Sequence, residues 1–437
     1  MGLLRTTKKY VARVTGVQRV LDRRIEQERV KHDADVVKLT AERDYAARQA
    51  RVQRRRAQGA EKMYRTNRRR ANELAALVRT LDQIPRYDYG SLMPGNQNWA
   101  KKWKVTTGHR IALFAKVDYS GSFYKWAAAI NEHTPHAARL AVTAPHQFGY
   151  SLDLLIPNPN LIKTNWRDLW EEADILHIKD ETGFMDGSNR LPREMLDDFR
   201  GPVVFTQYGG YARKNGENPA YQEFVRRFDS VISMTPDLCF DWLGASPNYV
   251  PHSIDTRLHE YSWLDGPLIG HSPSTRGRKG TEEFLQAIDD IKNEYGVDVD
   301  LIEGVSHEES VARKRHLGLF FDQAGREMAN ILGTDAVIGW YGNSALEAAV
   351  YGVPTVAHLS KSALDGARRA GFSDIDNIPI VNTQLGYEGI RETFMRLLEM
   401  TGAERESLAR STRLFIEEFH SQSTVGTRLI DVYRHLV

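Results

Sequence analysis

Short apolar runs alternate with amphipathic segments from residue 110 onward, and this alternation is the clearest pattern in the chain. The first of these runs are "RIALFAKV", "ARLAVT", "DILHIK", "PVVFTQY" and "DSVISMT". Helical segments or loops separate them, such as the helix-like "FYKWAAAINEH" that follows the turn "DYSGS". Strands that alternate with helices form a parallel sheet covered on both faces. The pattern therefore predicts an α/β domain.

A second set of the same kind starts after "NYVPHSIDT". Its apolar runs are "PLIGHSP", "VDLIEGV", "LGLFFD", "PTVAHL" and "IPIVN", and its first predicted helix is "GTEEFLQAIDDIKNEYG". Two consecutive α/β units predict two Rossmann-like domains that face each other across a cleft. Ligands of open parallel sheets bind beyond the carboxyl ends of the strands, so this cleft is the expected site.

These patterns give a provisional division of the chain. We predict a basic helical arm, a linker, a first and a second Rossmann-like domain, and closing C-terminal helices over residues 1–85, 86–108, 109–260, 261–400 and 401–437, respectively. In the linker, Trp99 and Trp103 stand among lysines. They fit either a membrane interface or a cap on the neighbouring domain.

The N-terminal part has the composition of a long helix. Residues 17–82 contain no proline and a single glycine, Gly59, which favours helix. Apolar residues keep a coiled-coil spacing only briefly, because Asp44, Arg48 and Arg51 then occupy seam positions. This segment is either a solvated helix, with pairing into a homo-oligomer as one form of it, or an arm that contacts a polyanion.

Charge separates this arm from the rest of the chain. Residues 1–80 contain 22 Lys and Arg against 9 Asp and Glu, whereas residues 81–437 contain 37 against 48. A basic arm on an acidic body indicates a separate role for the arm. Nucleic acid and an anionic membrane surface are both suitable partners, and the sequence does not distinguish them.

Cysteine content and hydropathy indicate the compartment. Cys239 is the single cysteine, so no internal disulfide forms and a reducing environment is expected. No apolar run is long enough to cross a bilayer, and the N-terminus lacks the apolar stretch of a signal peptide. We therefore expect a cytoplasmic protein, with peripheral membrane association through the arm left open.

The stretch "HSPSTRGRKG" places cations between a strand and a helix. Arg276 and Lys279 follow the predicted strand, and Gly280 immediately precedes the predicted helix. Arginine offers a planar fork to phosphate oxygens and lysine a mobile point charge, and Gly280 allows close approach of the backbone. Alone, this stretch fits a solvated turn as well as an anion site.

A second motif, "GNSALEAAVYGVP", opens another helix with small residues. Gly342 is followed by Asn343 and Ser344, either of which is a good N-cap. Glu347 lies three residues after Ser344, which matches a capping box. The alternative role for Glu347 is a carboxylate that accepts hydrogen bonds from ribose hydroxyls.

The order of "HSPSTRGRKGTEEFLQAI", "LIEGVSHEES" and "GWYGNSALEAAVYGVPTVA" resembles the donor-binding domain of GT-B glycosyltransferases, particularly glycosyltransferase family 4. The similarity covers roughly residues 109–400. It implies a GT-B fold and a nucleoside-diphosphate sugar as the donor substrate, with no cofactor and no metal. Transfer is expected to retain the anomeric configuration.

The resemblance also implies roles for the donor-side residues. Arg276 and Lys279 would bind the diphosphate and neutralise its charge as it departs. The backbone at Gly280 and from Gly342 to Ser344, which includes Asn343, would contribute to donor binding. Glu347 would hold the ribose.

The acceptor, a glycan or lipid, a protein or modified DNA, is expected to enter from the first domain. Gly121 and Ser122 lie in the turn after its first strand. His177, at the end of another predicted strand, either faces the cleft or is a structural residue among apolar neighbours. Tyr208 stands where many relatives have a histidine, with Arg213 downstream. These five residues are the acceptor-side candidates. No spacing typical of metal ligands is present.

Two departures from the family pattern leave a second function open. The first glutamate of the family's E-x7-E motif falls on Gly339, which affects recognition of the donor sugar. The second departure is in the position of the arginine, so that either Arg276 or Arg278 can be the counterpart of the family's arginine. The alternative is a degenerate GT-B scaffold, or a polyanion-binding protein that acts through its basic N-terminal helix.

If the arm binds a polyanion, deletion of residues 1–80 should abolish binding to duplex DNA or anionic vesicles. The intact chain should bind them more weakly as salt rises, because neutralising phosphates releases counterions. Co-sedimentation and fluorescence anisotropy at two salt concentrations measure this. Salt-sensitive binding that survives the deletion would place the cationic surface in the body of the protein.

Overall fold

The computed structural model describes residues 23–24, 97–155, 169–179, 196, 199–244, 247–327, 336–372 and 375–437. Apart from residues 23 and 24, the predicted arm lies outside the described residues. The chain divides into two compact units, Met1–Asp88 and Tyr89–Val437, and every labelled helix and strand belongs to the second.

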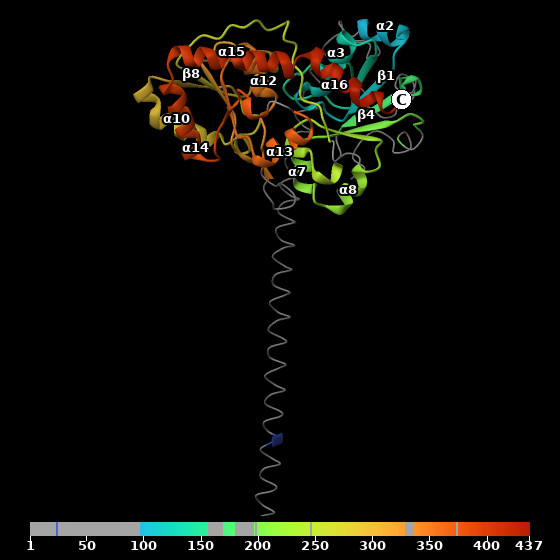
Figure 1. Ribbon diagram of the computed structural model, residues 1–437, viewed down its shortest axis with the longest axis horizontal. Coiled ribbons are helices and arrows are strands. Elements are labelled where there is room, and N and C mark those ends of the chain that lie inside the picture. The colour runs from blue at the N-terminus through green and yellow to red at the C-terminus, as the bar shows by residue number, and fades with distance from the viewer. Residues whose placement is uncertain are drawn as a thin grey trace, which may run out of the picture. The chain divides into compact units, whose positions relative to one another are not determined.

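The first lobe is built on a seven-stranded parallel sheet with the order β3-β2-β1-β4-β5-β6-β7 (Figure 1). Its strands are β1 (Arg110–Ala115), β2 (Ala137–Val142), β3 (Leu154–Leu155), β4 (Ile175–Lys179), β5 (Val203–Gln207), β6 (Ser230–Ser233) and β7 (Asn248–Tyr249). Its main helices are α2 (Gln97–Val105), α3 (Ser122–His133), α7 (Gly209–Asn215) and α8 (Pro219–Val225).

Strand β1 explains why the predicted strands are apolar without alternation. Ile111 and Leu113 pack in one core cluster with α3, whereas Ala112 and Phe114 pack in a second cluster with α8. Successive side chains of a strand point to opposite faces, and here both faces are covered. All four side chains are therefore buried.

The second lobe contains a five-stranded parallel sheet with the order β14-β13-β10-β8-β9. Its strands are β8 (Leu268–His271), β9 (Asp298–Leu301), β10 (Leu319–Gln323), β13 (Thr355–Ala357) and β14 (Val381–Asn382), and a separate antiparallel pair is β11 (Arg326–Glu327) with β12 (Ala336–Val337). Its helices are α9 (Arg276–Lys279), α10 (Thr281–Tyr295), α11 (His307–Lys314), α12 (Asn343–Ala349), α13 (Lys361–Arg369), α14 (Tyr387–Glu399) and α15 (Gly402–Phe419). The prediction of two Rossmann-like domains is confirmed.

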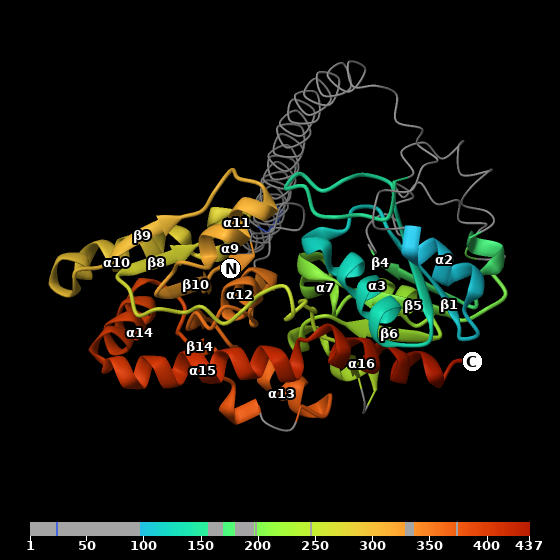
Figure 2. The same cartoon turned by 90° about the horizontal axis from the view of Figure 1, so that it is seen from above.

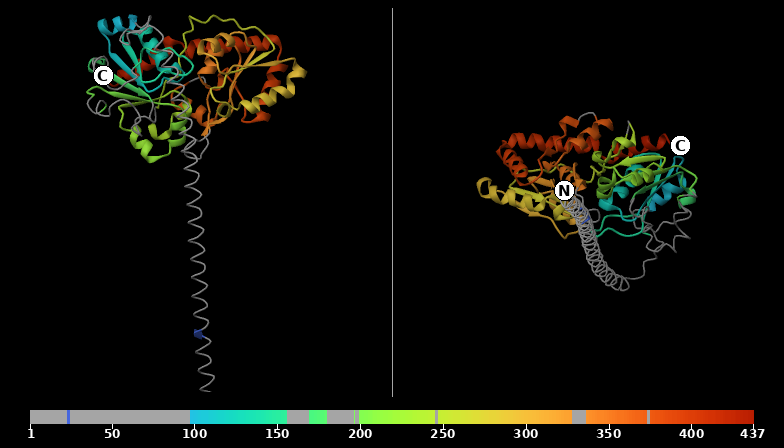
Figure 3. Two further views of the ribbon diagram at one scale, coloured as in Figure 1. Left: turned by 180° about the vertical axis from the view of Figure 1, so that it is seen from behind. Right: turned by 90° about the horizontal axis from the view of Figure 1, so that it is seen from below.

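The last helix, α16 (Gln422–Arg434), returns to the first lobe and packs on α3. Figure 2 shows α15 along the second lobe and α16 continuing to the first, and the C-terminus lies at the first lobe in both views of Figure 3. Val425 and Leu429 enter the core cluster that contains Trp126. At Gly426 the helices are so close that a Cβ would lie 2.9 Å from the Ala129 carbonyl oxygen. The predicted closing helices thus bind the two lobes together.

The segment predicted as a linker contains a helix, α2, that belongs to the first lobe. Trp99 and Trp103 are 8% and 4% exposed, and the Trp103 Nε1 donates to Glu172 Oε2 over 2.8 Å. The two tryptophans therefore cap the sheet and do not face a membrane. Among the described residues, no helix is both long and apolar enough to span a bilayer.

Several histidines are buried in the cores with both ring nitrogens bonded. His177 is bonded to the Tyr433 hydroxyl and to Thr206 Oγ1, each over 2.6 Å. Burial, and secondarily the nearby charge of Lys179, lowers its pKa to about 3. Burial likewise lowers the pKa of His271 to about 4 and that of His420 to about 4.

These histidines predict acid-sensitive stability. Their folded pKa lies below the ordinary value of about 6.5, so the unfolded chain binds more protons and the free energy of unfolding falls as pH falls below 6.5. Each of these histidines lowers the free energy of unfolding by roughly 2 kcal/mol as the pH falls from 6.5 to 5. Urea denaturation at several pH values should show this dependence weakened by His177→Gln and unchanged by the exposed His435→Gln. An unchanged dependence in His177→Gln would contradict the assignment.

Candidate functional site

A buried carboxylate lies where the two lobes meet. Glu347, on α12, is 3% exposed. Its Oε2 accepts a hydrogen bond from Lys314 Nζ over 2.7 Å, and its Oε1 accepts one from His307 Nε2 over 2.8 Å and another from Asn343 Nδ2. His307 and Lys314 are the first and last residues of α11. The Glu347 side chain therefore connects α12 to α11.

These partners keep Glu347 ionised. Burial alone raises the pKa of a carboxyl group. Here Lys314, then the hydrogen bond from His307 and the charge of Lys125, more than offset burial and hold the pKa of Glu347 well below its usual range.

The start of α12 differs from the predicted capping box. Gly342 is the N-cap, without a side-chain cap hydrogen bond, and Asn343 is the first helical residue. Glu347 turns to the cations of α11, so the predicted reciprocal bond with Ser344 is wrong. The Ser344 hydroxyl is buried with no hydrogen-bond partner among the described residues.

The first lobe reaches this cluster from α3 and from the loop before β3. Lys125 Nζ donates to Asn343 Oδ1 over 2.7 Å and lies 3.7 Å from Glu347 Oε1. The His307 amide donates to the Phe148 carbonyl over 2.9 Å, and the rings of Tyr150 and His307 are 4.2 Å apart between centroids. Both lobes therefore contact the same few residues.

Lys279 and Gly342 are brought together through Asp322, at the end of β10. Lys279 Nζ donates to Asp322 Oδ1 over 2.8 Å, and the Gly342 amide donates to Asp322 Oδ2 over 2.6 Å. A Cβ on Gly342 would lie 3.4 Å from the Lys279 ammonium. Gly280, between α9 and α10, has φ of +73° and lies against the Ala324 backbone, which explains the glycine there.

Arg276 binds carboxylates in the second lobe. Its Nη2 lies 2.7 Å from Glu303 Oε2 and its Nη1 lies 3.0 Å from Glu282 Oε1. The hydrogen bonds that Arg276 donates to Glu303, and then to Glu282, raise the pKa of Arg276. Its side chain remains 45% exposed. The structure thus gives Arg276 partners other than Asp322, the partner of Lys279.

Three of the acceptor-side candidates gather around Lys179, at the carboxyl end of β4. Lys179 Nζ donates to Asp118 Oδ1 over 2.9 Å and to Ser122 Oγ over 2.5 Å, and it lies 4.5 Å from the Tyr208 ring centroid. Gly121, with φ of +60°, lets the chain pass the Tyr150 ring, since a Cβ would lie 3.0 Å from it.

The other two candidates, His177 and Arg213, have structural partners. His177 lies two residues before the end of β4, where α3 and α16 cover it, and its exposure is 0%. Its predicted position facing a cleft is therefore corrected to the core. Arg213 Nε donates to Asp237 Oδ2 over 2.6 Å, so it holds α7 to the turn after β6.

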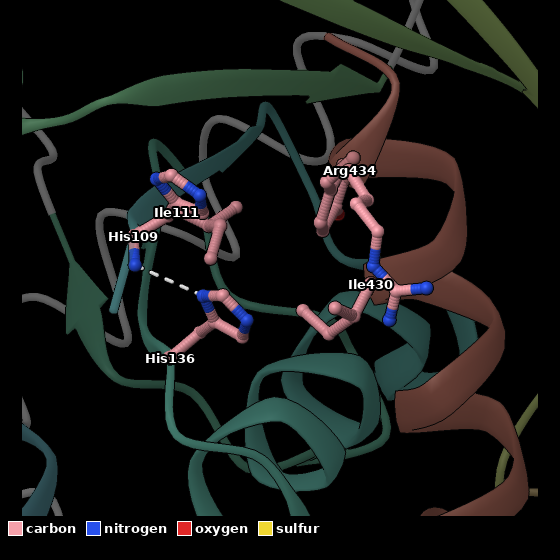
Figure 4. Close-up of a pocket in the computed structure, with 6 residues that line it drawn as sticks. His109, Ile111, His136, Ile430 and Arg434 are labelled. Carbon is pink, nitrogen blue, oxygen red and sulfur yellow. Dashed lines mark hydrogen bonds between the residues drawn. The ribbon is translucent and has the colours of Figure 1, made fainter. Parts of the chain in front are cut away.

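A cavity of about 200 Å³ lies at the other end of the first sheet, where β1 and β2 begin (Figure 4). Six residues line it: His109, Ile111, His136, Ile430, Tyr433 and Arg434. Ligands of parallel sheets bind at the carboxyl ends of the strands, so this gap beside α16 is not the candidate site. Within the described ranges, no group of three or more His, Cys, Asp or Glu is placed to hold a metal ion.

Two Rossmann-like lobes that share a C-terminal helix define the GT-B fold, and solved structures confirm it. Anabaena HepE in complex with UDP-glucose matches with a TM-score of 0.52 and 11% identity over 75% of this chain and 100% of that one. An alpha-glucosyltransferase in complex with UDP-glucose and DNA containing an abasic site matches with a TM-score of 0.50 and 14% identity over 75% and 99%. The same kind of enzyme with UDP and a 13-mer DNA containing an HMU base matches at 0.52 and 12%, with the same coverage.

At these identities the likeness establishes the fold. No protein-family model matches the sequence, and no curated protein matches it significantly.

Sequence reasoning missed four residues of the site. Asp322 ends the apolar run "LGLFFD", so the rule that ligands bind at carboxyl ends of strands could have identified it. His307 and Lys314 are seven residues apart, which places them on one face of a helix. Lys125 had no such signal, because only the packing of the lobes brings it to Asn343.

The structure explains why position 339, where the sequence resemblance would place a glutamate, is occupied by glycine. A Cβ at Gly339 would lie 2.1 Å from Ser360 Oγ and 2.7 Å from Ser360 Cβ. The Ser360 amide also donates to the Gly339 carbonyl over 2.9 Å, which fixes the two backbones. No side chain fits at this position without displacing the start of α13.

Gly339→Ala should therefore lower the free energy of unfolding by about 1–3 kcal/mol, the usual cost of overpacking. Ser360→Gly removes the obstructing side chain at a cost of a few tenths of a kcal/mol as an N-cap change. The double variant should be more stable than Gly339→Ala alone, as measured by urea denaturation. Gly402→Ala, where a Cβ meets only Asp265 at 3.6 Å, is the control. Strictly additive effects would disprove the contact.

Proposed function

We propose that this protein is a glycosyltransferase that moves a sugar from a nucleoside-diphosphate sugar to an acceptor hydroxyl. The observation that carries the proposal is the Lys279–Asp322–Gly342 arrangement beside Glu347, at the carboxyl ends of the second lobe's strands in a GT-B fold. The UDP-glucose complexes of the structural neighbours support a sugar nucleotide, with UDP-glucose as the first donor to test.

Lys279 is suited to bind the diphosphate. Its side chain is 15% exposed and its ammonium is oriented by the buried Asp322, so the charge is held in place before a ligand arrives. When the bond between the sugar's anomeric carbon and the phosphate oxygen breaks, its electron pair stays on that oxygen. A preorganised cation stabilises this charge more in the transition state than in the ground state.

Arg276 is the second cation in the proposal. It is half exposed and its present partners, Glu303 and Glu282, lie at the surface, so a rotamer change can bring it to a phosphate. Exposed ion pairs of this kind contribute little to the free energy of unfolding. Breaking them so that Arg276 can bind a diphosphate therefore costs little free energy.

Glu347 has room for one more hydrogen bond. A carboxylate offers about four acceptor positions, and protein donors take two on Oε1 and one on Oε2. A ribose hydroxyl would take the remaining position on Oε2. This requires local opening, because Glu347 is 3% exposed in this structure.

We propose further that the acceptor binds against the first lobe near Gly121, Ser122 and Tyr208. Its hydroxyl oxygen forms the new bond to the anomeric carbon, and its proton passes to the departing phosphate oxygen. Attack on the face that the diphosphate leaves retains the configuration and needs no protein nucleophile. A glycan or lipid, a protein and DNA stay open as acceptors, and the DNA complexes of the neighbouring enzymes add support for testing DNA.

Gly339 favours a second candidate, a degenerate GT-B scaffold that acts through its basic arm. A thermal-shift screen separates the two functions. A donor that binds only the folded state at 100 times its Kd stabilises it by about 2.7 kcal/mol. A panel of UDP-glucose, other nucleotide sugars and free nucleoside diphosphates should contain at least one such donor if the chain is a transferase. No response across the panel favours the scaffold.

Lys279→Ala and Arg276→Ala should each reduce sugar transfer, or donor hydrolysis where the acceptor is unknown, by 100-fold or more. Oxyanion stabilisation of this kind is commonly worth that factor. Arg276→Ala should unfold at nearly the wild-type midpoint, because the Arg276 side chain is 45% exposed. Lys279→Ala leaves the buried Asp322 carboxylate without its cation and should unfold at a lower midpoint, so its activity is measured well below that midpoint. Lys361→Ala, at an exposed position at the start of α13, is the matched control. Wild-type rates in the Lys279 variant would contradict the diphosphate assignment.

A further inference from the structure

Lys125 is a largely buried cation that donates few hydrogen bonds. Its side chain is 16% exposed, and its ammonium makes a single hydrogen bond, to Asn343 Oδ1. Glu347 Oε1, at 3.7 Å, is beyond hydrogen-bond distance. An ammonium has three donors. Among the described residues Lys125 bonds Asn343 and pairs with Glu347, so one donor is left without a partner.

The neighbouring lysines differ in this respect. Lys179 uses all three donors, on Asp118 Oδ1, Ser122 Oγ and the Tyr119 carbonyl. Lys314 is 1% exposed, bonds Glu347 Oε2 and lies over the Phe320 ring. Both are satisfied within the protein. Buried polar groups that lack partners are uncommon and need an explanation.

A count of the charges at the junction also leaves Lys125 without a carboxylate of its own. Lys125, Lys179 and Lys314 face two carboxylates: Asp118 pairs with Lys179, and Glu347 pairs with Lys314 and, at 3.7 Å, also with Lys125. Burial, and then the repulsion of Lys314, outweighs Glu347 and Asp118 and lowers the pKa of Lys125. A negative ligand would relieve this repulsion.

Two further polar atoms at the junction lack partners. Ser344 Oγ belongs to the residue after Asn343, the partner of Lys125, and it is buried without a hydrogen bond. His252 Nδ1 is also buried and unpaired, and His252 is close enough to Lys125 and Lys179 for their charges to lower its pKa, second to the effect of burial. Unfilled donors and a surplus cation thus occur in one small region.

We propose that Lys125 binds a phosphate group of the nucleoside-diphosphate donor, so that the first lobe contributes a cation to a site otherwise formed by the second lobe. This inference rests on the proposed function. On binding, the Lys125 ammonium donates hydrogen bonds to phosphate oxygens, either in addition to its bond to Asn343 Oδ1 or in place of it. The donor is then held from both lobes, by Lys125 on one side and Lys279 on the other.

The test compares UDP, UMP and uridine by isothermal titration calorimetry at low salt on the full chain. Lys125→Met keeps the aliphatic stem and removes the charge, and it should weaken UDP binding about 10- to 100-fold, the usual range for a charge-assisted hydrogen bond. Uridine binding should stay unchanged because uridine has no phosphate. Lys125→Arg should restore UDP binding to within a few-fold of wild type.

Lys101→Met, on the exposed face of α2, is the matched control and should leave all three affinities unchanged. If Lys125 serves only to hold the lobes together, Lys125→Met will weaken UDP, UMP and uridine equally, and the inference is overturned. Equal UDP binding by Lys125→Met and wild type overturns it as well. Absence of UDP binding by the wild-type chain counts instead against the proposed function with a UDP donor.

Discussion

The ionised carboxylate of Glu347 is the interaction on which the rest of the site depends. Removing such a charge from water costs several kcal/mol, and only close cations and hydrogen-bond donors offset that cost. Lys314 and His307 supply them from α11 and Asn343 from α12. The relative position of the two helices is therefore fixed by one side chain, and with it the loop that carries Gly342.

The same carboxylate links the donor side of the site to the contact between the lobes. Asn343 donates to Glu347 with its amide nitrogen and accepts from Lys125 with its oxygen. His307 bonds Glu347 with its ring and the Phe148 carbonyl with its amide. Any ligand that moves Glu347 must disturb both lobes. Because α16 joins the lobes independently, through its packing on α3, opening at Glu347 does not separate them.

The sequence was sufficient for features that depend on local pattern. Strands buried on both faces are apolar runs, and the cations of α9 and the small residues before α12 follow strand ends, so the fold and the Lys279–Gly342 pair could be predicted. The protein partners of Glu347 could not be predicted, because a capping partner is sought three residues away in sequence, whereas Lys314, the partner it binds, is 33 residues away. The sequence left His177 either in the core or at the site, because two residues along a strand decide between the two, and the structure places it in the core.

Under the proposed glycosyltransferase function, the glycine at position 339 constrains how a donor sugar could be recognised. At Gly339 the backbone packs against Ser360, and Asp322 already binds both Lys279 and the Gly342 amide. Gly339 has no carboxylate, and that of Asp322 is buried among its protein partners, so neither position presents a carboxylate to sugar hydroxyls. The polar groups that remain near Glu347 come largely from the first lobe, including Lys125 and Tyr150. Recognition of the sugar should therefore depend on the contact between the lobes more than on the second lobe alone, which makes the conformation held by Glu347 part of specificity.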